Sequence, residues 1–154
     1  MTTNLVLKSV NSISYASGKA TWKVNWAQFL EDPRAEYLVS FSFISEHSNA
    51  LDEGDVFTLE LTNIGTTIKS IEGGNFNSGT SREIGFIYVD ELHSAGAEHK
   101  LQANYSTNPP VTIVGRPDND LLEISFRDLT NTLTAKTPQF VLFLRFEKKC
   151  SCHK

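Results

Sequence analysis

The segments Thr21-Trp22-Lys23-Val24-Asn25-Trp26 and Tyr37-Leu38-Val39-Ser40-Phe41-Ser42-Phe43 decide the fold of this 154-residue chain. In both segments an apolar or aromatic residue stands at every second position. Because successive side chains of a β-strand leave opposite faces of the sheet, each segment offers one apolar face to a core. We therefore predict that both segments are half-buried strands.

Short segments of the same kind recur along the whole chain, with polar turns between them. The predicted strands are residues 5–10, 12–16, 20–26, 37–45, 56–63, 67–71, 83–89, 99–105, 111–114, 121–127 and 140–146. One helical turn is predicted for each of residues 27–31, 90–95 and 129–133. The crossover helices of a parallel sheet are missing, so the pattern predicts an all-β fold, an antiparallel β-sandwich in one domain.

Composition and charge narrow the classes of function. The chain has 14 Lys and Arg against 18 Asp and Glu, a net charge of -4, and no basic stripe that would hold nucleic-acid phosphates. Its apolar runs are shorter than the ~20 residues of a membrane span, and residues 1–10 do not have the pattern of a signal peptide. We expect an intracellular product with no direct nucleic-acid partner and no membrane span.

Two segments contain histidines or acidic residues that could bind a metal. His93 and His99 flank a short loop with Asp90, Glu91 and Glu98, which is either a site for two imidazoles and a carboxylate or a solvated loop tip. Residues 51–55 place three carboxylates around a glycine, which fits either a hard cation or a tight turn. Neither segment has the ligand spacing of a known metal motif.

The C-terminal residues and one glycine-rich segment contain residue types that occur in metal and phosphate sites. Cys150, Cys152 and His153 are soft metal ligands, although their spacing also suits a mobile tail. Residues 73–79 are rich in glycine but lack the Lys-Ser or Lys-Thr ending of a phosphate-binding loop. No nucleophile motif is present. We therefore assign no catalytic, cofactor-binding or metal-binding residue, and we expect that the protein is not an enzyme.

Two features leave a choice open. Residues 140–146 are apolar on both faces, because Val141 and Phe143 share the side on which polar residues are expected. This second face is covered either by a loop of the chain or by a neighbouring subunit. Trp22 and Trp26 lie on one side of their strand, where they either fill the core or form a platform on which a sugar stacks.

A family resemblance rests on three segments. Residues 21–26 with Phe29 and Leu30, the long aromatic strand at residues 37–45, and the closing strand at residues 140–146 resemble strands of small capsid proteins of large double-stranded DNA viruses. The resemblance covers about the first third of the chain and its last strand. It implies a single jelly roll with eight principal strands, of which residues 20–26 are the first.

The resemblance also implies a domain organisation and a function. Residues 1–18 would be an N-terminal arm or edge strand, residues 19–147 the jelly roll, and residues 148–154 a mobile tail. The protein would be a penton or minor capsid protein, assembled in the host cell interior, that forms a homopentamer and contacts neighbouring capsid proteins. The contact loops would be residues 46–55, 72–81, 92–98 and 116–120. The alternative is a lectin-like or protein-binding β-sandwich module.

Overall fold

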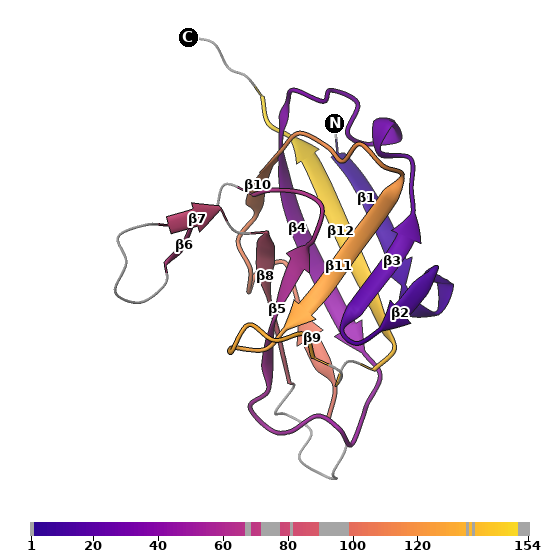
Figure 1. The fold of residues 1–154 in the computed structure, drawn as a ribbon, viewed down its shortest axis with the longest axis vertical. Helices are drawn as coiled ribbons and strands as arrows, with labels where there is room; N and C mark the ends of the chain where they lie inside the picture. Colours follow the sequence, from indigo (N-terminus) through magenta and orange to yellow (C-terminus); the bar gives the residue numbers. More distant parts are fainter. Residues whose placement is uncertain are drawn as a thin grey trace.

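The computed structural model describes residues 2–66, 69–71, 78–80, 82–89, 99–134, 136 and 138–150. In chain order the strands are β1 (Thr2–Lys8), β2 (Ser14–Ala16), β3 (Lys19–Lys23), β4 (Glu36–Ser45), β5 (Val56–Leu61), β6 (Lys69–Ile71), β7 (Ser78–Thr80), β8 (Glu83–Val89), β9 (Leu101–Ala103), β10 (Val111–Val114), β11 (Leu121–Arg127) and β12 (Phe140–Lys148). Two 3-10 turns, η1 (Ser9–Asn11) and η2 (Trp26–Gln28), lie between strands. The predicted all-β fold is confirmed (Figure 1).

Ten of the strands form one antiparallel sheet that folds back on itself. Neighbouring strands follow the order β1-β12-β4-β9-β8-β5-β11-β3-β2, and β10 pairs with the other half of β4. In Figure 1, β3 and β11 lie over β1 and β12, so the sheet makes two layers. The ring centroids of Phe43 on β4 and Phe126 on β11 are 5.6 Å apart, so side chains of the two layers are in contact across the core. This arrangement is compatible with a β-sandwich.

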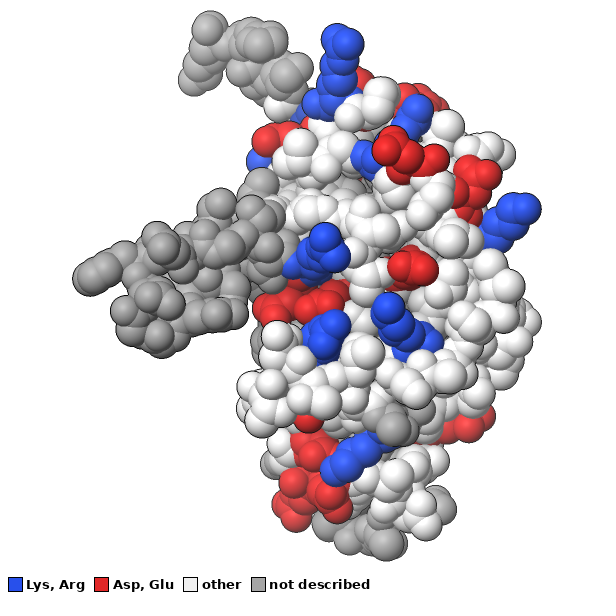
Figure 2. All heavy atoms as spheres, viewed as in Figure 1, with Lys and Arg blue, Asp and Glu red and all other residues white. Residues whose placement is uncertain are grey.

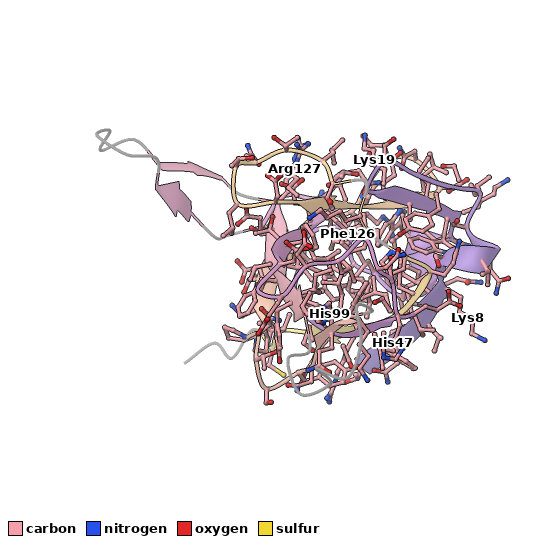
Figure 3. All side chains as sticks on the ribbon, turned by 90° about the horizontal axis from the view of Figure 1, so that it is seen from below. Lys8, Lys19, His47, His99, Phe126 and Arg127 are labelled. Atoms are coloured by element: carbon pink, nitrogen blue, oxygen red, sulfur yellow. The ribbon has the colours of Figure 1, made fainter. Side chains whose placement is uncertain are left out.

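Aromatic side chains fill the space between the layers. Phe140 lies 5.3 Å from Phe126 and 6.1 Å from Trp22, measured between ring centroids. Figure 3 shows Phe126 between the layers, whereas the next residue, Arg127, lies on the outside. Edge-to-face contacts of this kind add to the free energy gained from the buried area.

Both tryptophans belong to this core. Trp22 is 6% exposed and Trp26 is 3% exposed. Each indole N–H donates to a backbone carbonyl, that of Lys8 at 3.1 Å for Trp22 and that of Leu121 at 2.8 Å for Trp26. The core interpretation is confirmed, and a sugar-stacking platform built on these two residues is wrong.

The predicted strands are all present, with shifted ends. The strand predicted at residues 20–26 stops at Lys23, because Asn25 accepts a hydrogen bond from the Ala27 N–H and starts η2. The short strand β7 was not predicted. The helical turn predicted at residues 27–31 corresponds to η2, and the one at residues 90–95 lies outside the described residues.

The helical turn predicted at residues 129–133 is wrong. Asp128 accepts hydrogen bonds from the N–H groups of Thr130 and Thr132, each at 3.0 Å. An aspartate that binds the backbone two residues further on makes a turn rather than a helix. The backbone N–H of Asp128 also donates to the Thr132 carbonyl, which closes the turn.

Residues 2–16 provide the two terminal strands of the sheet order. β1 pairs with β12 over seven residues, from Thr2 opposite Glu147 to Lys8 opposite Val141. β2 pairs with β3 at the other end of the order. Within the described ranges no helix is long and apolar enough to cross a membrane.

Candidate interface on the outer face of the sheet

Outward apolar side chains line up across neighbouring strands. Val141 of β12 lies opposite Ile44 of β4, which lies opposite Gln102 of β9, and Gln102 lies opposite Tyr88 of β8. One step along the strands, Phe143 of β12 lies opposite Val6 of β1. We call the outward side chains of Val6, Ile44, Phe86, Tyr88, Val141 and Phe143 the apolar band.

The apolar band is not covered by the described part of the chain. Val6 is 54% exposed, Ile44 is 47% exposed, and Phe86 and Phe143 are each 41% exposed. Scattered apolar residues are normal on a protein surface, but contiguous patches are rare on monomers and mark interaction sites. Of the two alternatives for the outer face of β12, a covering loop and a neighbouring molecule, the exposure of Phe143 favours the neighbour.

A groove of about 390 Å³ lies at one end of the apolar band. It is lined by residues of β1, η1, the end of β4 and the start of β12, among them Val10, Ile44 and Val141. Ser9 fixes its floor, because the Ser9 hydroxyl contacts Gln139 and accepts a hydrogen bond from the Phe140 N–H at 2.8 Å. The groove is therefore a built part of the fold.

Charged residues of both signs border the apolar band. Lys8 lies opposite Val141, and Glu46 follows β4 with its N–H bonded to the Gln139 carbonyl at 2.8 Å. Arg145 and Glu147 continue the outer face of β12. All four are exposed, and none of them makes an ion pair with another described residue. They are available to a partner.

The outer face formed by β3, β11 and β5 is polar. Arg127 of β11 and Ser125 of the same strand both bind the Glu60 carboxylate of β5, at 3.2 Å and 2.9 Å. Glu123 accepts a hydrogen bond from the Thr62 hydroxyl at 3.0 Å, and Lys19 and Lys23 of β3 are exposed. Figure 2 shows acidic and basic side chains spread over this face. Such a face is typical of a solvated surface, so it differs in character from the apolar band.

The acidic segment at residues 51–55 is a turn closed by a lysine. The ammonium of Lys136 lies 2.9 Å from Asp52 Oδ2 and 3.4 Å from Asp55 Oδ2. The hydrogen bond from Lys136 to Asp52, and after it the one to Asp55, raises the pKa of Lys136. The Asp52 N–H donates to the Asp55 carboxylate at 2.8 Å. The carboxylates of Asp52 and Asp55 thus already have a cationic partner, which favours the tight turn over the hard-cation site.

The other metal candidates gain no support from the described residues. His99 pairs through its backbone with Ser48, and its Nδ1 has no hydrogen-bond partner. His93 and its acidic neighbours lie outside the described residues, as do Cys152, His153 and residues 73–77 of the glycine-rich segment. Cys150 is an exposed free thiol. Within the described ranges no three His, Cys, Asp or Glu side chains are grouped to hold a metal.

Sequence reasoning found part of the apolar band and missed the rest. Val141 and Phe143 stood out because they break the alternation of their strand. Ile44 breaks the alternation too, because it is an apolar residue on the outward side of β4, where Ser40 and Ser42 are polar. What the sequence could not indicate is that Ile44, Val141 and Tyr88 share one row, because that depends on which strands are neighbours.

Comparisons with known proteins add little. No protein-family model matches this chain, and no curated protein matches it. Among solved structures it is similar to the tripod (BppUct-A-L) from the baseplate of bacteriophage Tuc2009, with a TM-score of 0.37 and 5% sequence identity. The match covers 96% of this chain and 64% of that chain. A TM-score of this size does not establish a shared fold.

Proposed function

We propose that this chain is a structural protein of a virion, a single jelly-roll capsid component that acts by self-association and by contact with neighbouring capsid proteins. The observation that carries the proposal is the uncovered apolar band. Contact with another molecule removes an apolar surface of this kind from water, which is favourable. Permanent interfaces are also more apolar than transient ones. The function is then geometric, and it needs no cofactor and no catalytic residue.

The strand order supports the jelly-roll part of the proposal. One layer has the order β1-β12-β4-β10 and the other the order β3-β11-β5-β8. The first and last strands are neighbours, and the chain crosses between the layers repeatedly. Two interlocking Greek keys give such an order in a jelly roll of eight strands. A jelly roll with this strand order would begin at β1 rather than at residues 20–26.

The finer proposal is a penton at the fivefold vertex of the capsid. It comes from the family resemblance, which implies a homopentamer in the virion that contacts its capsid neighbours. In such a ring the copies meet head to tail, and loops at the ends of the sandwich make the contacts. Of the loops proposed for this role, residues 46–55 and 116–120 lie within the described part of the chain.

A lectin-like module remains the second candidate, on different residues from those first considered. Phe86 is 41% exposed and lies 6.1 Å from Tyr88 between ring centroids, so an aromatic pair is accessible on β8. Exposed aromatic rings are suited to stacking on a sugar. A glycan-array signal that Phe86→Ala abolishes would favour this candidate over the capsid protein.

Two measurements test the capsid proposal. Light scattering after gel filtration is expected to give a mass above the 17.2 kDa of one chain, with five chains for a penton, and the mass is expected to rise with concentration. Antibody labelling of purified particles is expected to place the chain in the virion. A protein that stays a single chain at millimolar concentration and is absent from particles contradicts the proposal.

A further inference from the structure

We infer that the free edge of β1 binds an extended segment of another protein, which pairs with β1 as an added antiparallel strand. In this mode of recognition, main-chain hydrogen bonds supply the affinity, and pockets for alternate side chains supply the specificity. The inference goes beyond the proposed function, because it assigns a backbone edge and the kind of segment that the edge takes. It does not depend on a place in a virion.

The hydrogen bonds around β12 show which backbone groups of β1 point away from β12. In an antiparallel pair, the N–H and C=O groups of every second residue point to the same neighbouring strand. The Glu46 N–H donates to the Gln139 carbonyl, and the Lys149 N–H donates to the Glu36 carbonyl. Both pairs continue the register of β4 with β12, so the odd-numbered positions of β12 face β4. The even-numbered positions of β12 therefore face β1.

The even-numbered residues of β1 consequently expose their backbone groups at the free edge. Leu5 lies opposite Leu144, so its N–H and C=O point to β12. The Lys8 carbonyl points the other way and accepts a hydrogen bond from the Trp22 indole N–H at 3.1 Å, in agreement with this alternation. Among the residues that the structure describes, backbone partners on the free side are absent for Thr2, Asn4 and Val6.

The two ends of the sheet order differ in their capacity to accept a strand. β2 has three residues, whereas β1 has seven, with no proline and an unbroken register with β12. The one charged side chain of β1 is Lys8, at the end of the strand. Natural edge strands are often very short or carry charges and bulges, which prevent pairing with other chains. β1 lacks these protections over most of its length.

The core side of β1 is incompletely covered at the same edge. Leu5 packs against the core but is only half-buried, whereas Leu7 is 6% exposed. Thr3 is half-buried as well and lines a pocket of about 240 Å³ together with Phe29 and Tyr37. Side chains of directly opposite residues lie about 4.5–5.5 Å apart. An added strand would thus cover Leu5 with an apolar side chain and bring an aromatic one to this pocket.

The outer side of β1 defines two more residues of the added segment. Val6 is 54% exposed at the border of the apolar band, so an apolar residue is favoured opposite Val6. Lys8 is exposed and makes no ion pair with another described residue, so an acidic residue is favoured opposite Lys8. The segment is therefore extended, with alternating side chains that are acidic and apolar on one side and apolar and aromatic on the other.

A designed heptapeptide is the probe for this segment. From the position opposite Lys8 to the position opposite Thr2, its sequence is glutamate, threonine, valine, valine, threonine, tyrosine and threonine, with both ends blocked. Calorimetric titration of the full chain is expected to give a dissociation constant below about 1 mM. A peptide with alanine in place of the tyrosine is expected to bind about tenfold more weakly, because the pocket beside Thr3 is then left empty.

Amide hydrogen exchange tests the alternation residue by residue. In the free protein the amides of Asn4 and Val6 are expected to exchange at least about tenfold faster than those of Leu5 and Leu7, which are bonded to β12. Saturation with the peptide is expected to slow exchange at Asn4 and Val6 at least about tenfold and to leave Leu5 and Leu7 nearly unchanged. Nuclear magnetic resonance of the nitrogen-15-labelled chain measures all four rates.

Substitutions in β1 test the edge itself. Asn4→Pro removes an N–H that has no partner, so the chain is expected to stay folded and to bind the peptide at least about tenfold more weakly. Lys8→Glu is expected to weaken binding about fivefold, and a peptide with lysine in place of its glutamate restores the affinity. Lys19→Glu is the matched control, because Lys19 lies on β3, away from Lys8 in Figure 3. Circular dichroism checks that each variant is folded.

The outcomes separate the inference from the proposed function. The inference is overturned if the peptide does not bind, if it binds the Asn4→Pro variant equally well, or if Asn4 and Val6 already exchange slowly in the free chain. Slow exchange that depends on protein concentration would show that a second copy occupies the edge, which also overturns it. Particles that lack this chain overturn the capsid proposal alone.

Discussion

At the scale of single residues, the side chain of Asn108 makes the hydrogen bonds to β8 that a neighbouring strand would make. It is 2% exposed, its Oδ1 accepts a hydrogen bond from the Phe86 N–H, and its Nδ2 donates to the Phe86 carbonyl, both at 2.9 Å. Gly85 makes this approach possible, because a Cβ at that position would lie 2.5 Å from Asn108 Oδ1. The Asn108 amide thus satisfies the hydrogen-bonding groups of the β8 backbone at Phe86. This position lies next to a register shift in the pairing of β8 with β5.

We predict that Asn108→Ala lowers the free energy of unfolding by about 2–4 kcal/mol, because it leaves two backbone groups of Phe86 without a partner. Urea unfolding measures the change. Asn104→Ala is the matched control, since Asn104 is exposed and binds only its own turn at Ser106 and Thr107. Its expected cost is below about 1 kcal/mol. Equal costs for the two variants would contradict the role assigned to Asn108.

The carboxylate of Asp128 makes the stability depend on pH. The Thr130 hydroxyl donates to it at 2.6 Å, and this bond, followed by that of the Thr132 N–H, holds the pKa of Asp128 below its ordinary value of 3.8. A carboxyl group whose pKa is lower in the folded than in the unfolded protein stabilises the fold at pH values above its pKa in the unfolded chain. This stabilisation is lost as the pH falls through the pKa of the folded state. Asp128→Asn removes the titrating group.

We therefore predict that the natural chain loses more unfolding free energy between pH 6 and pH 3 than the Asp128→Asn variant does. Denaturant unfolding at a series of pH values gives both curves. Parallel curves would show that the hydrogen bonds of Asp128 do not shift its titration.

At the scale of elements, the β2–β3 hairpin depends on a two-residue turn. Ser17 has a φ of 52° and Gly18 a φ of 75°, and both positive values are those of a type I′ turn. The Gly18 carbonyl also accepts a hydrogen bond from the Phe126 N–H at 2.8 Å, and a Cβ on Gly18 would collide with the Thr134 carbonyl. The turn therefore joins the hairpin to β11.

Opposite effects are predicted for two substitutions in this turn. Gly18→Ala is expected to lower the free energy of unfolding by about 2 kcal/mol or more, from backbone strain and the collision. Ser17→Asn is expected to raise it by about 0.5 kcal/mol, because asparagine adopts positive φ more readily than serine. Thermal unfolding measures both. A stabilising alanine at position 18 would refute this account of the turn.

The two-residue periodicity of the sequence predicts one part of this structure and not another. Alternation reveals which side chains of a strand face the core, so the long strands β4, β5, β8, β11 and β12 were predicted within a few residues. It contains no information on which strands are neighbours. The pairing of β1 with β12, and hence the row from Lys8 through Val141 to Ile44, could not be predicted.

For the candidate sites, too, local features could be predicted from the sequence and contacts between distant segments could not. The apolar outer face of β12 was visible as a break in alternation, since a local pattern is enough to reveal it. The partner of the acidic segment was not, because Lys136 stands 84 residues from Asp52 in the chain. Contacts between distant segments arise from the fold, and a single sequence does not reveal them.

At the scale of the whole molecule, β1 completes the layer that carries the apolar band. Leu7 is 6% exposed and belongs to the core, whereas its neighbour Val6 is 54% exposed on the outer face. We predict that Leu7→Ala lowers the free energy of unfolding by about 2–4 kcal/mol and that Val6→Ala costs less than about 1 kcal/mol. Chemical unfolding of the two variants measures the difference. Similar losses for both would mean that β1 is not docked through Leu7.

The pairing of β1 with β12 also has a consequence for synthesis. β1 leaves the ribosome long before the strand against which it will lie, so its hydrogen-bonding groups and Leu7 have no partner strand until β12 has been synthesised. Nascent chains arrested before β12 should accordingly be digested readily by protease and retained by chaperones, and protection should come only once β12 has emerged from the exit tunnel.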